Sequence, residues 1–323
     1  MRQKATGLVK RWPLPTWGGA AACVGFACVA LACTVSSSAS YPSLIRGTST
    51  PDAAWAATRS EDWDAAAARW QSLFLASEGR DPVACRETAR AMAAAGDPEG
   101  ALEVLSIGLE AAPDDPDLLE SRGLVWADMG YRRAAEGSLE DALFADPNRV
   151  SALRSLGRVR LSLNRSTAAM EPLERCIELG ATDTETRLLL CRAQVCAGFT
   201  DEAFEGFVLA CAADDVTAGD LVDATALMLE ARGLECGTLE GWLERALELN
   251  PNNAQAHYYL GVVHSASKDY SVALKCWRRT VALDPGHVGA LEGIAECHRR
   301  RGKHEQAARF KRRAEQAAKS PYR

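Results

Sequence analysis

The chain has 323 residues, of which 47% are apolar and 7% aromatic, and a formal net charge of −6. Ala and Leu dominate the apolar content, which favours helices packed through small residues over the strands of a β-sheet. Residues 48–287 carry 22 Lys and Arg against 39 Asp and Glu, a charge of −17, and this excludes a general nucleic-acid-binding surface, because phosphate binding needs a clustered positive face.

Residues 1–47 have the layout of an export signal. Four basic residues come before an uncharged, mostly apolar stretch at 17–35, and a serine-rich segment follows it. This order is typical of signal and anchor segments. Basic residues ahead of the apolar stretch stay on the cytoplasmic side. We therefore expect a membrane-anchored protein whose body, from residue 48 on, is extracytoplasmic, on the periplasmic or cell-envelope side.

The apolar stretch at 17–35 has three possible fates. It is close to the ~20 residues that a membrane-spanning helix needs, so it can remain as an uncleaved anchor. Ala30-Leu31-Ala32 also fits the small-x-small pattern of a cleavage site before Cys33, which would release a secreted or periplasmic protein. Thirdly, the small residue before Cys33 resembles a bacterial lipoprotein site, where that cysteine receives the lipid. The sequence leaves all three open.

Beyond residue 48, small residues return at intervals of 34 along the chain. Such a period is the mark of a repeat protein in which each repeat is one supersecondary unit. The alanine series is Ala67, Ala101, Ala135, Ala169 and Ala203, resumed by Ala273 and Ala307, and the second series is Gly123, Gly157, Cys191, Gly261 and Ala295.

Within each unit, apolar residues at three- and four-residue steps predict two amphipathic helices. Gly130 and Gly198 fall in the expected turns between these helices, where positive φ can be needed. Prolines at 147, 251 and 285 are expected to end the second helix. The units start near residues 82, 116, 150, 184, 218, 254 and 288, after a degenerate unit from about 48.

These units resemble the tetratricopeptide repeat family, whose pattern is a Leu-Gly pair, then an aromatic residue, Ala, a second aromatic residue and Pro. Leu156-Gly157 and Leu260-Gly261 match the pair, Trp126 takes the place of the first aromatic residue, and Phe207 and Trp277 that of the second. The resemblance implies an all-α fold, a right-handed α-solenoid of helix-turn-helix repeats over residues 48–321.

Two units depart from the pattern. The unit at 218–253 has two extra residues and carries Leu239 in the usual Ala position, so we expect a bend or altered stacking there. The unit at 184–217 lacks its terminal proline and has Asp214-Asp215 instead.

The resemblance further implies a concave groove, lined by the first helix of each unit, that binds a peptide or a partner helix. The charged residues at the groove positions have two interpretations. The arginines bind carboxylates of an acidic peptide, or they pair with acidic residues on neighbouring helices. The candidate partner-binding residues are Arg86, Arg90, Asp117, Glu120, Arg154, Arg158 and Arg192.

The sequence contains no recognisable catalytic or metal-binding pattern. None of the eleven cysteines forms a C-x-x-C pair, and neither an H-E-x-x-H, a P-loop nor a G-x-S-x-G motif occurs. We therefore expect a non-enzymatic protein-interaction scaffold without cofactor or metal. The alternative is a self-assembling protein, a homo-oligomer in which the acidic body of one chain meets the basic C-terminal unit, residues 288–323, of the next.

Overall fold

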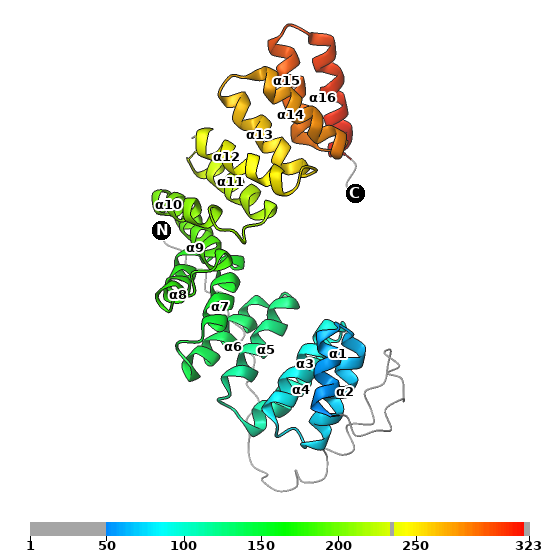
Figure 1. Ribbon diagram of the computed structural model, residues 1–323, viewed down its shortest axis with the longest axis vertical. Coiled ribbons are helices and arrows are strands. Elements are labelled where there is room, and N and C mark those ends of the chain that lie inside the picture. The colour runs from blue at the N-terminus through cyan, green and yellow to red at the C-terminus, as the bar shows by residue number, and fades with distance from the viewer. Residues whose placement is uncertain (1–49, 233–235, 320–323) are drawn as a thin grey trace, which may run out of the picture. The chain divides into compact units, whose positions relative to one another are not determined.

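The computed structural model describes residues 50–232 and 236–319, in which sixteen helices and no strand occur (Figure 1). The predicted all-α solenoid is therefore confirmed for this part of the chain. The helices are α1 (Pro51–Arg59), α2 (Trp63–Ala76), α3 (Pro82–Ala94), α4 (Pro98–Ala111), α5 (Pro116–Asp128), α6 (Arg132–Ala145), α7 (Val150–Ser162), α8 (Ser166–Glu178), α9 (Thr184–Ala197), α10 (Thr200–Cys211), α11 (Ala218–Arg232), α12 (Cys236–Leu249), α13 (Ala254–Ala266), α14 (Tyr270–Leu283), α15 (Val288–Arg300) and α16 (His304–Ala318).

The predicted anchor at 17–35 and the possible processing site at Cys33 lie outside the described residues. Among the helices that are described, none combines the length and the apolar character needed to cross a membrane.

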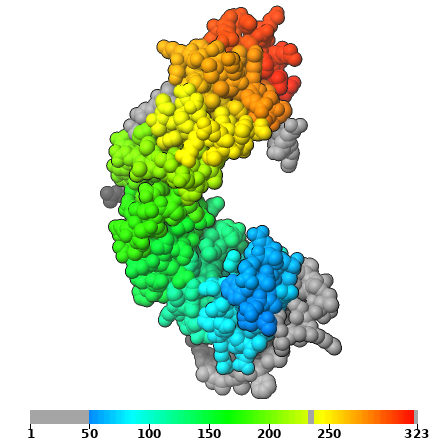
Figure 2. Space-filling view, in the orientation of Figure 1, coloured from blue at the N-terminus to red at the C-terminus, as the bar shows by residue number. Residues whose placement is uncertain are grey.

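The helices form eight consecutive pairs, each packed mainly against the pairs before and after it. Along the stack in Figures 1 and 2, the colours follow one another in chain order. From α3 on, the first helix of each pair also contacts the first helix of the next pair. We call this row, α3, α5, α7, α9, α11, α13 and α15, the helix-A wall.

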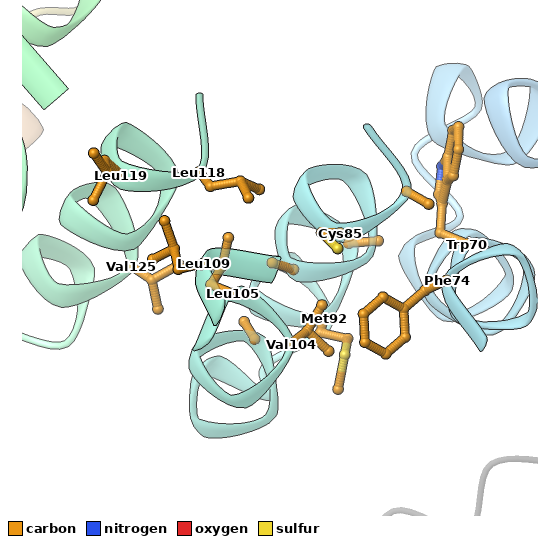
Figure 3. Close-up of a cluster of buried hydrophobic side chains, with 14 of the residues drawn as sticks. Trp70, Phe74, Cys85, Met92, Val104, Leu105, Leu109, Leu118, Leu119 and Val125 are labelled. Carbon is orange, nitrogen blue, oxygen red and sulfur yellow. The ribbon is translucent and has the colours of Figure 1, made fainter. Parts of the chain in front are cut away.

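Apolar side chains of successive pairs form a shared core. Figure 3 shows the first part of it, in which Phe74 of α2 points toward Met92 of α3, and Leu105 of α4 lies on the side of α5. Leu105 and Leu118 are fully buried. Because a two-helix unit cannot cover its own apolar faces, this burial between neighbours is what holds the stack together.

Polar residues at the starts of the first helices explain where these helices begin. Asp81, Asp115, Asp183, Asn253 and His287 each accept a hydrogen bond from a backbone N–H in the first turn of the helix that follows. Such caps satisfy N–H groups that have no partner inside the helix. At the turns, Gly130 and Gly198 have the predicted positive φ, 82° and 93°.

Glycines let the two helices of a pair approach each other closely. A Cβ on Gly157 would lie 2.6 Å from Cγ of Leu173, a distance that no real contact tolerates. In the pair α9–α10 this arrangement is exchanged: the equivalent position is Cys191, and Gly206 on α10 makes room for it, with 2.5 Å between a Cβ there and the Cys191 sulfur. The close crossing is therefore kept although the repeat pattern is broken.

The junction between α10 and α11, where the irregular unit at 218–253 begins, differs from the other junctions. Six residues, 212–217, connect these helices, whereas four or five connect the other successive pairs. The α11 helix has 15 residues against 13 in α7, so the two extra residues of its unit lengthen this helix. Packing between α10 and α11 is the sparsest between any two successive pairs of the described chain.

Candidate partner-binding site

The N-terminal part of the helix-A wall carries arginines that are already bonded to acidic residues. Arg86 of α3 lies 3.0 Å from the carboxylate of Glu87 and 3.4 Å from that of Asp117 on α5. Arg90 lies 3.5 Å from Glu87, which is itself buried. The structure thus places the candidate residues Arg86 and Asp117 in one ion-pair cluster.

Arg149, which was not among the predicted site residues, completes this cluster. Its guanidinium donates hydrogen bonds to Asp117 and to Glu120, whose side chain is only 9% exposed. Burial disfavours the charged guanidinium, but these two hydrogen bonds outweigh it and raise the pKa of Arg149. A signal for this role exists in the sequence, because Arg149 stands where the neighbouring units have the capping residues Asp115 and Asp183.

A second cluster joins α7 to the start of α9. Arg154 lies 3.0 Å from Asp183 and 3.1 Å from Glu185, and Arg158 lies 3.1 Å from Glu185. Burial alone would raise the pKa of Asp183, but hydrogen bonds from Thr186 and the charge of Arg154 lower it. The candidate residues Arg154 and Arg158 therefore do come together, through a carboxylate that they share.

The ion pairs are those expected if the arginines bond acidic residues on neighbouring helices, though with different partners for Arg154 and Arg158. Their role in binding a partner stays a prediction, as does that of Asp117 and Glu120. Arg192 differs from the other candidates, since no ion pair joins it to any residue in the described part of the chain.

Arg192 instead lines a pocket of about 310 Å³ between α9 and α11, at the irregular junction. The pocket has an apolar floor and a charged rim. The floor is made by Leu188, Leu189, Phe207, Ala224 and Leu227, and the rim by Thr184, Glu185, Arg192, Asp215, Asp220 and Asp223. Two first helices supply most of these side chains, so the pocket is part of the helix-A wall.

Two acidic residues of the rim, Asp215 and Asp220, are held by hydroxyl and amide groups rather than by arginines. Asp215 accepts a hydrogen bond from the Thr184 hydroxyl. Asp220 accepts from the backbone N–H and the hydroxyl of Thr217, at 2.9 and 2.7 Å. Over residues 50–232 and 236–319, no salt bridge joins Asp215, Asp220 or Asp223 to a cation. The rim therefore combines four carboxylates, including that of Glu185, with one guanidinium.

Tyr259 of α13 packs against the same buried cluster as Leu188 and Leu227 of the pocket, whereas Tyr258 packs toward α15. Burial raises the pKa of Tyr259, and the charges of Tyr258, Glu230 and Asp223 add to this effect. The rings of Tyr258 and Tyr259 are 5.0 Å apart. An aromatic surface thus continues the wall on the C-terminal side of the pocket.

The cysteine thiols near the pocket are poor nucleophiles. Burial raises the pKa of the Cys191 and Cys211 thiols near the pocket to about 12, so neither provides a thiolate nucleophile at neutral pH. In the part of the chain that the structure describes, no group of His, Cys, Asp and Glu side chains is arranged to hold a metal ion.

Comparison with known proteins agrees with this architecture. Two family models described as the tetratricopeptide repeat match the chain, one at residues 123–184 and 263–321 and the other at residues 242–274. Over residues 123–184 and 242–321 the chain is therefore similar to tetratricopeptide repeats. These matches include α7 of the second ion-pair cluster, α8 and the last two helix pairs, α13 to α16. No curated protein matches the chain in sequence.

Solved tetratricopeptide-repeat structures share the fold. The C-terminal part of a repeat protein from Cytophaga hutchinsonii is 15% identical, with a TM-score of 0.57, and the match covers 75% of this chain and 98% of that one. A repeat protein from Parabacteroides merdae is 13% identical, with a TM-score of 0.54, over 76% of this chain and 96% of that one. At these identities the likeness is one of fold alone.

Proposed function

We propose that this tetratricopeptide-repeat protein is a non-enzymatic interaction scaffold that holds a peptide or a helix of a partner protein on its helix-A wall. The pocket between α9 and α11 carries this proposal. It combines an apolar floor, in which Leu188 and Leu227 are only half-buried, with charged groups around it. Such a combination is typical of ligand sites in proteins.

Site-specific photo-crosslinking in the native cell tests this proposal. A photoreactive amino acid replaces Leu188 or Leu227 in the pocket, and a matched variant carries it at Phe144, which is 91% exposed on α6, a second helix. We expect one crosslinked partner from both pocket positions and not from Phe144. The same adduct from all three positions, or none from the pocket, would contradict binding at the wall.

We further propose that the scaffold is anchored to a membrane and works on the extracytoplasmic side. The order of charged, apolar and serine-rich segments in residues 1–47 supports this. Fractionation, intact mass and protease protection test it. A full-length, membrane-bound chain whose repeats are digested from outside is the expected result, and a chain cut before Cys33 would indicate a secreted or periplasmic form. Repeats protected inside the cell would overturn the proposal.

A further inference from the structure

We propose that the pocket between α9 and α11 receives a lysine or arginine side chain of the partner, with an apolar side chain of the same segment against the pocket floor. This inference rests on the proposed scaffold function and adds the chemistry of the partner.

The charges of the rim select a cation. Glu185 is already neutralised by Arg154 and Arg158, at 3.1 Å from each. The other carboxylates of the rim, at 215, 220 and 223, face a single guanidinium, that of Arg192. Since complementary charge sets the specificity of an interface, the unmatched negative charge favours a basic segment and disfavours an acidic one.

The floor of the pocket suits the rest of such a side chain. Lysine and arginine carry long aliphatic stems that pack on apolar surface while the charged end stays near solvent or an acid. Leu188, Leu227 and Phe207 offer that surface, with the carboxylates above it. Tyr259, which packs against the same buried cluster as Leu188 and Leu227, adds an aromatic ring that attracts a guanidinium or ammonium group further along the segment.

An acidic peptide finds fewer free cations on this wall. It would have to displace Asp183 and Glu185 from Arg154 and Arg158, or Asp117 and Glu120 from Arg149. Each exchange replaces an existing charge-assisted hydrogen bond and so gains little.

A displayed library of random dodecapeptides, selected on the full-length protein, tests the inference. We expect the enriched sequences to contain Lys or Arg next to an apolar residue. Asp223→Lys places a cation in the rim at an exposed residue that makes no hydrogen bond among the described residues. The matched control is Glu205→Lys, an exposed carboxylate on α10 that does not line the pocket.

Affinities of the enriched peptides give the size of the effect. We expect Asp223→Lys to weaken binding by about tenfold or more, and Glu205→Lys by less than about twofold. Binding to the wild-type protein should also weaken as salt screens the charges. Equal affinities for the two variants would overturn the assignment of the pocket.

Arg192→Glu separates a basic from an acidic occupant by the sign of its effect. If the pocket takes a cation, removal of this guanidinium strengthens binding of the enriched peptides several-fold. If the wall binds an acidic segment, the same change abolishes binding. Stronger binding supports the inference and loss of binding overturns it.

The remaining outcomes distinguish this inference from the proposed function. The enriched peptides could show no preference for basic residues and still crosslink to the photoreactive amino acid at position 188. This result would agree with the scaffold function and overturn the cationic occupant. No enriched peptide at all would count against both. Salt-sensitive self-association abolished by Asp223→Lys would identify the occupant as the basic C-terminal unit of a second copy, and not as a separate partner.

Discussion

Two parts of the helix-A wall differ in the groups that bond their carboxylates. From α3 to the start of α9, residues 82–185, arginines of one pair bond carboxylates of the next, as Arg149 does with Asp117 and Glu120. We call this the arginine-paired stretch. At the junction of α9 and α11, Asp215 and Asp220 are bonded to threonine hydroxyl and amide groups, and the connecting segment is longer.

In residues 82–227, ion pairs between units accompany the regular stacking, and the pocket lies where the stacking is irregular. In the arginine-paired stretch, where the pairs repeat at a fixed step, arginine side chains reach a neighbouring pair and neutralise its carboxylates. Where the step changes, a pocket opens and charges are left for a partner. The first part contributes to stability and the second is available for recognition, a division that is common because binding sites are rarely optimised for stability.

The largest expected effect is the loss of Arg149 from the arginine-paired stretch. Arg149→Ala leaves the buried carboxylate of Glu120 without its partner, and we expect it to lower the free energy of unfolding by about 3 kcal/mol. Urea denaturation followed by helical circular dichroism measures the change. Glu120→Gln in the same chain should recover part of it, since the unpaired charge is then gone.

Arg158→Ala is the control for that prediction. Its side chain is 59% exposed and has one acidic partner, so we expect a loss below about 0.5 kcal/mol. Similar losses for the two variants would mean that burial does not distinguish the ion pairs of this wall.

The next effect concerns the exchanged glycine at the junction. Gly206→Ala brings a Cβ to 2.5 Å from the Cys191 sulfur, and we expect about 2 kcal/mol of destabilisation from overpacking. Cys191→Gly in the same chain should restore most of it, because the sulfur that the new Cβ meets is then gone. A double variant no more stable than Gly206→Ala alone would refute the exchange.

A smaller effect, with a defined pH dependence, belongs to Asp183 where the two parts meet. Removal of its cap and its bond to Arg154 by Asp183→Ala should cost about 1 kcal/mol at neutral pH. Because the folded-state pKa lies below the ordinary value of 3.8, the carboxylate stabilises the fold above that pH. This contribution is lost as the pH falls through the lowered pKa. Unfolding midpoints of variant and wild type should therefore converge below about pH 4, and a constant gap would contradict the role of the charge.

The smallest effect is expected at the rim of the pocket. Asp223→Asn removes one of several unmatched carboxylates, so its effect on stability should lie within about 0.5 kcal/mol and be neutral or stabilising. Thermal unfolding in low salt is the measurement. Glu185→Gln, which removes the carboxylate that Arg154 and Arg158 share, should be destabilising under the same conditions. If Asp223→Asn were the more destabilising of the two, the distinction between the two parts of the wall would be wrong.

The fold class was predictable because it depends on small residues at fixed steps. Ala135, Gly157 and Gly261 occupy helix crossings where a larger side chain does not fit, so the period survives in the sequence. The departures from the period were informative as well, since Asp214-Asp215 and the two extra residues mark the junction where the pocket lies.

The site itself was only partly predictable. Arg192 was among the candidate residues and lines the pocket, whereas Asp220 and Asp223 were not. Their orientation depends on the lengthened α11, outside the regular pattern. Arg149 was missed because a long side chain can reach several acidic residues, and only the surrounding helices decide which of them it bonds.

The sparse packing between α10 and α11 also bears on how the chain carries mechanical load. Each pair of a solenoid is held by its neighbours alone, so a pulling force passes through every interface in turn. The interface with the sparsest packing opens first, and here that is the interface between α10 and α11, which residues 212–217 connect. We expect a stretched chain to open there first. A partner segment bound across α9 and α11 would hold the two pairs together and raise the force needed to separate them. The stiffness of the whole chain under load would then depend on whether a partner is bound at this one junction.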